Sequence, residues 1–328
     1  MKIKKIISSV LALSMTISMT CTTAFAIDNT TVPNQNDFVY TDEVLQTYGG
    51  VGIATMSLDE YEPNDFDNPY SMGTIKAKSS PIYEVNASIN DTDDILDGYS
   101  FSAYENSSYK EENVDELVVL LGGLSYGDRL VMIIANSNDE EIASGVIDGS
   151  NGSVAYVTFP TNGAGYYGEY KIYIVLASVL DGSTGYNSEV NYKLQVASRY
   201  VRATQQFYAR TTAIKYSGSY ADWSQAGYMY IRESDAPKSA IVDSMFVNGT
   251  LIDTRTGKQS YVNILRLWNG TKEVAGKCPD MMENLDRFEL PVVGTWTIKY
   301  VPHFDKDHTH ELRNFSARID YTYDILAG

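Results

Sequence analysis

The sequence predicts an all-β protein with two consecutive antiparallel β-sandwich domains of jelly-roll-like type. Tyrosine is abundant, with 26 among 328 residues, and tyrosine, valine, isoleucine and threonine favour pleated, half-buried strands. Short apolar runs are separated by turn-forming clusters at the spacing typical of a sandwich. About 300 residues remain after an expected leader peptide, which is enough for two domains of ordinary size.

The first 26 residues are typical of a secretory signal peptide. Lys2, Lys4 and Lys5 precede an apolar run that begins at Ile6, and Ala24-Phe25-Ala26 supplies a small-residue cleavage site. We therefore expect a secreted, extracellular protein. The apolar run is too short to span a bilayer, and no later segment approaches the roughly 20 apolar residues that a membrane helix needs.

Removal of this segment changes the charge and the cysteine count. Three lysines and no acids are lost, so the formal charge moves from −17 to −20, and Cys278 becomes the single cysteine. One thiol forms no internal disulfide, so burial or metal ions must supply stability. The negative charge argues against nucleic acid and against anionic membrane surfaces as partners, whereas it suits the recruitment of cations.

Residues 27–58 are polar and lack a periodic apolar pattern, so we expect a short flexible leader there. The first sandwich is predicted over residues 59–198. Its clearest strand is Glu169–Ala177, where apolar residues alternate from Tyr170 onward and share one face. The other predicted strands of this domain are Glu116–Leu121, Arg129–Asn136, Val154–Phe159 and Val190–Val196.

The second sandwich is predicted over residues 199–328. Its clearest strand is Phe315–Tyr323, in which apolar and polar residues alternate over nine positions, as in a half-buried strand. Cys278–Phe288 is predicted to contain a short helix, with Pro279 at its first position. The other predicted strands are Gly227–Arg232, Ile241–Val247, Tyr261–Trp268 and Gly294–Val301.

Two acidic segments in the first domain offer oxygen ligands for a hard cation. The first is Glu62-Pro63-Asn64-Asp65, and the second runs from Asp91 to Asp97 and includes Asp94. Because Ca²⁺ takes about 6 to 8 oxygen ligands, the two segments together predict a calcium site. The alternative is an ordinary acidic turn, since Asp and Asn side chains hydrogen-bond to their own backbone in turns.

The order of these segments resembles the bacterial pre-peptidase C-terminal domain. The Glu-Pro-Asn-Asp turn is followed by an Asp-x-Tyr-x-Phe strand that ends at Phe101 and by a closing Tyr192-Lys193-Leu194-Gln195-Val196 strand. The resemblance covers roughly Leu58 to Ala197. It implies a small non-catalytic β-sandwich, usually attached to secreted peptidases, with relatives in bacterial collagenases that bind Ca²⁺ and collagen. It also implies four cation ligands: Glu62, Asn64, Asp65 and Asp97. Asp94 lies beside Ile95, which replaces an acid that is usual in the family.

The second half weakly resembles the β-sandwich domain that follows the catalytic domain in proprotein convertases. The residues that carry this resemblance are Val242–Val247, Tyr261–Gly270 and Gly294–Ile298. This resemblance implies a β-sandwich fold for the second half and nothing about its function.

All three histidines of the chain lie within eight residues, at His303, His308 and His310. Imidazole and carboxylate groups together bind transition metals such as Zn²⁺, and the spacing of His308 and His310 places two imidazoles on one side of an extended segment. The alternative is a polar hairpin loop between a strand that ends at Pro302 and one that starts near Leu312.

Aromatic residues flanked by glycine and serine form a third candidate site, made of Tyr216, Tyr220 and Trp223. Flat aromatic rings offer large, rigid contact area with a polar tip, which suits carbohydrate or extended peptide. We expect the rings of Tyr220 and Trp223 to be partly exposed and close together. The alternative is that these rings pack in the core.

The sequence contains no His-Glu-x-x-His helix, no Gly-x-Ser-x-Gly elbow and no phosphate-binding glycine loop. We therefore expect a secreted, non-catalytic binding protein, stabilised by Ca²⁺, that recognises a cell surface or an extracellular polymer such as collagen-like protein or polysaccharide. Two alternatives stay open. One is a metal-dependent secreted hydrolase that uses the segment from His303 to His310, and the other is a structural subunit of a surface assembly.

Overall fold

The computed structural model describes residues 37–41, 53–57, 64, 68–76, 82–90, 94–103, 116–152, 154–161, 168–181, 189–217, 223–303 and 308–327. The regular elements in these ranges are β-strands, apart from the short helix α2 (Ala177–Asp181) and the 3-10 turn η2 (Asp286–Phe288). The predicted all-β class is therefore confirmed. The expected signal peptide, residues 1–26, lies outside the described residues. In the part of the chain that is described, no helix is both long and apolar enough to span a membrane.

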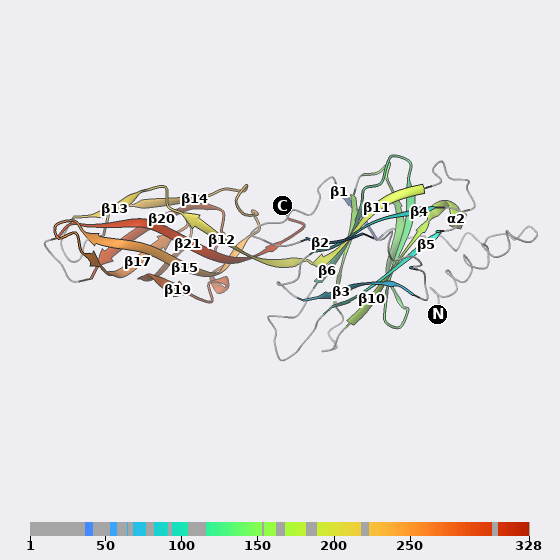
Figure 1. The fold of residues 1–328 in the computed structure, drawn as a ribbon, viewed down its shortest axis with the longest axis horizontal. Helices are drawn as coiled ribbons and strands as arrows, with labels where there is room; N and C mark the ends of the chain where they lie inside the picture. Colours follow the sequence, from blue (N-terminus) through green and yellow to red (C-terminus); the bar gives the residue numbers. More distant parts are fainter. Residues whose placement is uncertain are drawn as a thin grey trace, which may run out of the picture. The chain divides into compact units, whose positions relative to one another are not determined.

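The chain divides into two compact units between Arg199 and Tyr200 (Figure 1). The first unit pairs a six-stranded sheet with a five-stranded sheet. In order, the six strands are β1 (Val39–Thr41), β9 (Val154–Pro160), β6 (Glu116–Gly122), β11 (Glu189–Ser198), β4 (Ile82–Asn90) and β2 (Ile53–Ser57). The five strands are β3 (Tyr70–Ile75), β5 (Leu96–Ala103), β10 (Gly168–Leu176), β7 (Arg129–Asn136) and β8 (Glu141–Asp148). Pairing is antiparallel except for the parallel pairs β2–β4 and β3–β5.

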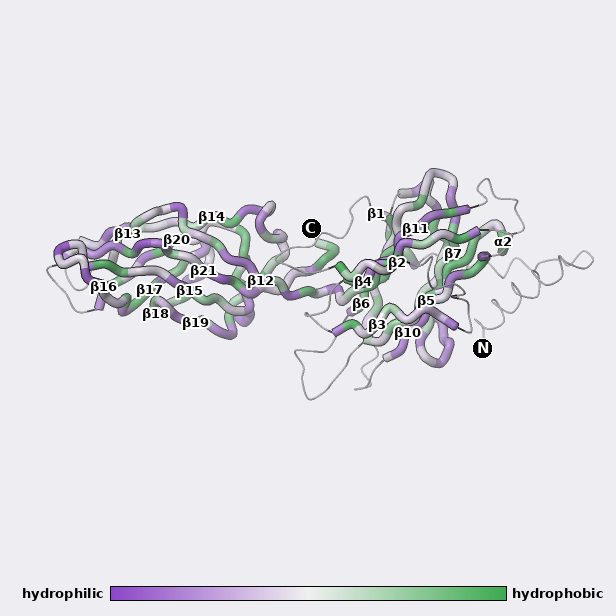
Figure 2. The backbone as a smooth tube through the Cα atoms, in the orientation of Figure 1, coloured by the Kyte–Doolittle hydropathy of each residue, from purple (hydrophilic) through white to green (hydrophobic). Residues whose placement is uncertain are grey.

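Strand β7 shows why the first unit is apolar through its middle. Its side chains are buried from Leu130 to Ala135, and Figure 2 shows this strand in green, the hydrophobic end of the scale. Met132 and Ile134 belong to the core between the sheets. Ile133 belongs to a smaller cluster on the opposite face, where Val179 of α2 packs. Because both faces of the strand are covered, a continuous apolar run is required in place of simple alternation.

The prediction of a flexible leader over residues 27–58 is wrong for the two segments that form β1 and β2. Phe38, directly before β1, belongs to the core of the first unit. The Tyr40 hydroxyl donates to the carbonyl of Val146 at 3.2 Å and accepts from the backbone N–H of Asp148 at 3.0 Å. Strands of three and five residues are too short to show a clear period-2 alternation. Their place in the sheet is set by pairing with strands that are distant in the sequence.

The second unit is a sandwich of a six-stranded sheet and a four-stranded sheet. The first follows the order β12 (Tyr200–Tyr208), β21 (His310–Asp324), β15 (Ile241–Asp253) and β16 (Gln259–Ser260), with β13 (Ala213–Tyr216) paired to β21 and β19 (Asp280–Met282) paired to β15. The second follows the order β14 (Gly227–Ile231), β20 (Gly294–Pro302), β17 (Val262–Trp268) and β18 (Glu273–Cys278). The strand pairs described in both sheets are antiparallel.

The alternation predicted for the last strand is confirmed in β21. The predicted inward residues are all buried: Phe315, Ala317, Ile319, Tyr321 and Tyr323. The helix predicted within Cys278–Phe288 is wrong, because this segment forms β19 and then the single 3-10 turn η2. Residues 280–282 pair with residues 245–247 of β15, and this tertiary pairing outweighs the local helical signal.

Candidate functional site

Asn64 lies against the strand that carries Asp97. The backbone carbonyl of Asn64 accepts a hydrogen bond from the Gly98 N–H at 2.5 Å, so Asn64 and β5 are neighbours, as a shared cation site requires. The Asn64 and Asp97 residues are 2% and 0% exposed. Glu62 and Asp65, the other two ligands implied by the family resemblance, lie outside the described residues.

Asp97 is a carboxylate on the inner face of β5. It lies on the same face of the strand as Tyr99, which belongs to the core. The Tyr192 hydroxyl of β11 donates to Asp97 Oδ2. The hydroxyls of Tyr99 and Tyr192 lie 2.5 Å apart. Burial, then the neighbouring Tyr99 and Asp97, raise the pKa of Tyr192 well above 10.0, so this phenol remains a hydrogen-bond donor at neutral pH.

Asp94 closes the turn between β4 and β5. Its N–H donates to Asn90 Oδ1 at 3.4 Å and its carbonyl accepts from the Asn90 N–H at 2.8 Å. Asn64, Asp94 and Asp97 therefore provide hard oxygen donors of the type that Ca²⁺ prefers. Within the described residues, no cluster of three or more histidine, cysteine or acidic side chains is arranged to hold a metal ion. These residues supply only part of the expected ligand set.

The histidine segment is organised around Asp253. His308 Nδ1 lies 3.0 Å from Asp253 Oδ2, and His308 Nε2 lies 2.9 Å from Arg255 Nη1. Burial favours a higher pKa for Asp253, but hydrogen bonds from Thr256 and from the Arg255 backbone, with the nearby His308, lower this pKa to about 2. An imidazole held between a carboxylate and a guanidinium is fixed in orientation.

The three histidines differ in environment. His303 is exposed, whereas His310 is 2% exposed and begins β21. The rings of His308 and His310 have centroids 6.5 Å apart. The expectation of a three-histidine loop site is therefore corrected for His310, which is a core residue. It is buried because it pairs with Tyr216 of β13 and Asp253 of β15, so its segment is a central strand.

The aromatic loop candidate is also corrected in part. Tyr216 is 1% exposed, because it ends β13 and shares the inward face of Ile214; its ring packs near that of Tyr300 at 6.3 Å. Tyr220 lies outside the described residues. Trp223 is partly exposed, and its ring lies under the Arg266 guanidinium at 4.1 Å.

The outward face of the four-stranded sheet carries a group of exposed rings that sequence reasoning missed. Tyr228, Tyr230 and Trp268 are 39%, 43% and 47% exposed. Tyr228 and Trp268 both lie opposite Thr297 of β20, one on each side. Because neighbouring strands are about 4.8 Å apart, the backbones that carry these two rings are separated by roughly 10 Å. We call these three residues, with Trp223, the aromatic face.

Arginine side chains contact two rings of this surface. The rings of Tyr228 and Tyr230 are stacked, with centroids 6.2 Å apart and planes 26° apart, and the Arg210 guanidinium lies 5.1 Å from the Tyr230 ring. Such cation–π contacts hold exposed rings in one orientation. The signal for this surface is local alternation, since Tyr228 and Tyr230 flank the buried Met229 in a predicted strand.

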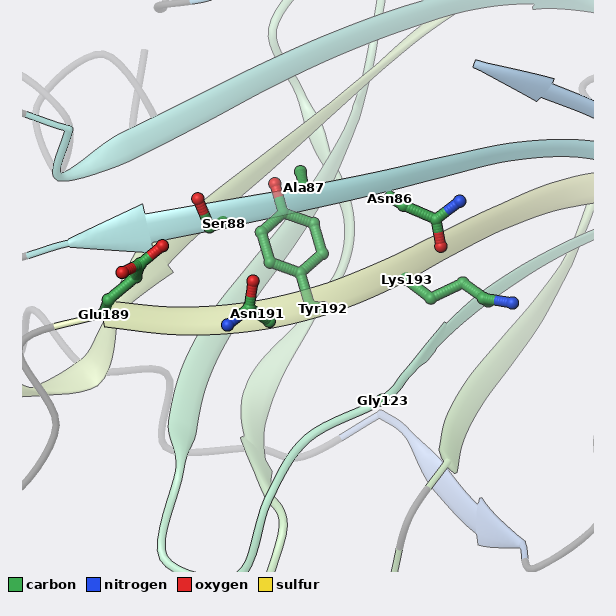
Figure 3. Close-up of a pocket in the computed structure, with 8 residues that line it drawn as sticks. All are labelled: Asn86, Ala87, Ser88, Gly123, Glu189, Asn191, Tyr192 and Lys193. Carbon is green, nitrogen blue, oxygen red and sulfur yellow. The ribbon is translucent and has the colours of Figure 1, made fainter. Parts of the chain in front are cut away.

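A shallow depression of about 470 Å³ lies over β4 and β11, close to where β6 ends. Figure 3 shows its lining residues, which come from these two strands and from the turn after β6. Asn191 lies opposite Ser88, and Lys193 lies opposite Asn86, so polar side chains share one face. The only ring there belongs to the buried Tyr192. The depression offers hydrogen-bonding groups without an exposed aromatic surface.

No family model matches the chain, and no curated protein matches it. Among solved structures, the chain is similar to BuGH86 in complex with neoagarooctaose, with 12% identity and a TM-score of 0.25 over 75% of this chain and 33% of that chain. It is similar to the CBM22-1-CBM22-2 tandem domain of Xyn10C from Paenibacillus barcinonensis, with 9% identity and a TM-score of 0.22 over 67% of this chain and 82% of that chain.

A third similarity is to PNGase F, a glycosylasparaginase from Flavobacterium meningosepticum, with 10% identity and a TM-score of 0.21 over 74% of this chain and 96% of that chain. The chain spans about a third of the length of BuGH86. At these TM-scores the similarities carry no argument about fold or function.

Proposed function

We propose that the chain is a secreted, non-catalytic binding protein that attaches to an extracellular polysaccharide through the aromatic face. The observation that carries this proposal is the exposure of Tyr228, Tyr230 and Trp268 on one sheet face. Large apolar groups gathered at a surface promote unwanted association, and proteins avoid them unless they serve binding. Rigid aromatic side chains also lose little conformational entropy on contact, so they are effective anchors.

The chemistry of the aromatic face suits sugar rings. A pyranose has one flat side of C–H groups, which packs on an aromatic ring, and an edge of hydroxyls, which needs hydrogen-bond partners. Thr297 supplies a hydroxyl between Tyr228 and Trp268, and Thr295 lies opposite Tyr230. Rings on both sides of a hydroxyl-bearing strand match a polymer of repeating sugars better than they match a single small molecule.

The first unit would use calcium as a structural clip. In this proposal, Glu62, Asn64, Asp65 and Asp97, the four ligands that the resemblance to the pre-peptidase C-terminal domain implies, hold one Ca²⁺, and Asp94 substitutes for the acid that Ile95 replaces. The hydrogen bond from the Gly98 N–H to the Asn64 carbonyl supports it. At a free Ca²⁺ concentration of 100 dissociation constants the gain is about 2.7 kcal/mol. A melting temperature that is equal in Ca²⁺ and in chelator would contradict the clip.

A binding assay with insoluble polymers tests the proposed function. The full mature chain is mixed with cellulose, chitin, xylan, bacterial cell walls and collagen, and the fraction bound is measured. Truncating a central aromatic anchor costs about 2 kcal/mol or more, which is roughly 30-fold in affinity. Tyr228→Ala and Trp268→Ala should therefore abolish retention on the bound polysaccharide. Tyr126→Ala is the matched control, because Tyr126 is 87% exposed in the first unit.

The competing functions predict different outcomes in the same assay. A hydrolase would release new reducing ends from the polysaccharides, and the release would be lost in His308→Ala. A collagen-like partner would retain the protein on collagen and not on the polysaccharides. Either result, or retention that survives both Tyr228→Ala and Trp268→Ala, would overturn polysaccharide binding by the aromatic face.

A further inference from the structure

The aromatic face is cationic, although the protein is strongly acidic. The outward positions on the strands of this sheet include Arg266 of β17, Lys299 of β20 and Lys277 of β18, all exposed, and a single acid, Glu273 of β18. Three positive charges and one negative charge give this face a net charge of +2, whereas the whole chain carries −17. The sign of the charge therefore reverses locally, at the same surface that carries the exposed rings.

The two central cations lie directly opposite each other. Arg266 pairs with Lys299 in the register of β17 and β20, and like charges in such cross-strand positions are destabilising. Glu273 lies 3.1 Å from Arg266 and neutralises one of the two charges. No ion-pair partner of Lys299 is found among the described residues. An arrangement that costs stability in the free protein is explained when a ligand supplies the missing negative charge.

The position of Arg266 is fixed by its neighbours. Its guanidinium is stacked on the Trp223 ring at 4.1 Å and is paired with Glu273. Trp268 lies two residues further along β17 on the same face, about 6.7 Å away along the strand. A ligand whose sugar ring rests on Trp268 therefore extends toward Arg266 and Lys299 within one repeat.

We propose that the aromatic face binds an anionic polysaccharide, whose sugar rings stack on Trp268 and Tyr228 while ring carboxylate or sulfate groups pair with Arg266 and Lys299. This inference rests on the proposed function and names the class of polymer. A neutral polysaccharide would use the rings alone and would leave Lys299 without a counter-charge. Arginine and lysine bind both carboxylate and sulfate oxygens, so the shared chemistry is a negatively charged sugar polymer.

Matched pairs of polymers test this inference. Affinity is measured with the mature chain by tryptophan fluorescence, for polygalacturonate against its methyl ester and for chondroitin sulfate against desulfated, carboxyl-reduced chondroitin. Solvent-exposed ion pairs raise affinity by up to about fivefold each. We expect at least one anionic polymer to bind roughly tenfold more tightly than its neutral match, as two such contacts allow. The preference should shrink as salt rises to about 0.5 M, because screening weakens exposed ion pairs.

Lys299→Ala is the decisive variant, because Arg266→Ala also removes the stack on Trp223. We expect Lys299→Ala to lower the affinity for the anionic polymer by roughly threefold to fivefold and to leave the affinity for the neutral polymer unchanged. Lys299→Arg should keep the preference, and Lys258→Ala, an exposed lysine between β15 and β16, is the charge-matched control.

The outcomes separate this inference from the proposed function. Equal binding of charged and neutral polymers, unaffected by Lys299→Ala, would overturn the anionic preference and leave polysaccharide binding intact. Failure to bind any polysaccharide would overturn both. Preference for the carboxylated pair or for the sulfated pair would each support the inference and would identify the acid group.

Discussion

Replacement of Tyr192 by phenylalanine removes one hydroxyl from the interior of the first unit. That hydroxyl donates to Asp97 Oδ2 and lies 2.5 Å from the Tyr99 hydroxyl. Tyr192 is 3% exposed and Asp97 is 0% exposed, so water cannot replace the lost donor without a rearrangement of the core. The carboxylate therefore loses a hydrogen bond that the solvent does not restore.

The magnitude follows from the two bonds. A hydrogen bond to a charged group contributes about 1.5 to 3 kcal/mol, and a bond between neutral groups contributes about 0.5 to 1.5 kcal/mol. We expect Tyr192→Phe to lower the free energy of unfolding of the first unit by about 2 to 4 kcal/mol. With a urea m-value of about 2 kcal/mol per molar, the unfolding midpoint falls by roughly 1 to 2 M.

The protein carries its own means of separating the two units in this assay. All three tryptophans, Trp223, Trp268 and Trp296, lie in the second unit, so tryptophan fluorescence follows that unit alone. Circular dichroism follows both units. The first unit unfolds in the transition that circular dichroism detects and tryptophan fluorescence does not. In Tyr192→Phe the midpoint of that transition should fall, and the midpoint of the fluorescence transition should not change.

The matched control is Tyr99→Phe, which removes the bond between the two phenols and keeps the bond from Tyr192 to Asp97. It should cost about 1 kcal/mol, and equal midpoints for Tyr99→Phe and Tyr192→Phe would refute the reasoning. A pH profile adds a second check. The pKa of Tyr192 is raised in the folded state, so its stabilisation is present below the unfolded pKa near 10 and is lost as pH rises further. The wild type should therefore lose stability in alkali more steeply than Tyr192→Phe.

Three further predictions concern buried residues. Burial, with the nearby Asp280, raises the pKa of Cys278 to about 12, so a chromogenic disulfide reagent should label this thiol at pH 8 only when the second unit unfolds; fast labelling of the folded chain would contradict this. His310→Ala should cost roughly 2 to 4 kcal/mol in a denaturant titration, whereas equal losses in His308→Ala would show that both rings are equally buried. Phe38→Ala should destabilise the first unit by about 3 to 5 kcal/mol, and an unchanged midpoint would restore the flexible-leader interpretation.

The strands that the sequence predicted are those with a long local pattern. β7 runs from Arg129 to Asn136 as predicted, because an apolar run between turn clusters is read within its own segment. β1 and β2 were missed because their evidence is not local. β1 is defined by pairing with β9, and β2 by a parallel pairing with β4, and neither pairing leaves a signal in the leader's polar composition.

The errors at the candidate sites have a related cause. Tyr216 was placed in an exposed loop because glycine and serine follow it, although the buried Ile214 two residues earlier already puts Tyr216 on the inward face. The charged residues before His310 likewise indicate a loop, although His310 begins β21 and is buried. In both cases the flanking composition indicates a loop, whereas the period of the strand decides which way the side chain points.

The aromatic face required both kinds of information. Alternation with Met229 in β14 and with Leu267 in β17 is local, and it turns Tyr228 and Trp268 away from the core. Their proximity is not local, because it depends on β14 and β17 both pairing with β20, where Thr297 faces each of them. The sequence thus determines which rings are exposed, and the order of strands in the sheet determines which exposed rings can share a ligand. A binding surface on a β-sheet is for this reason a property of the pairing, and it becomes visible only when residues about 70 and 30 positions apart are brought onto adjacent strands.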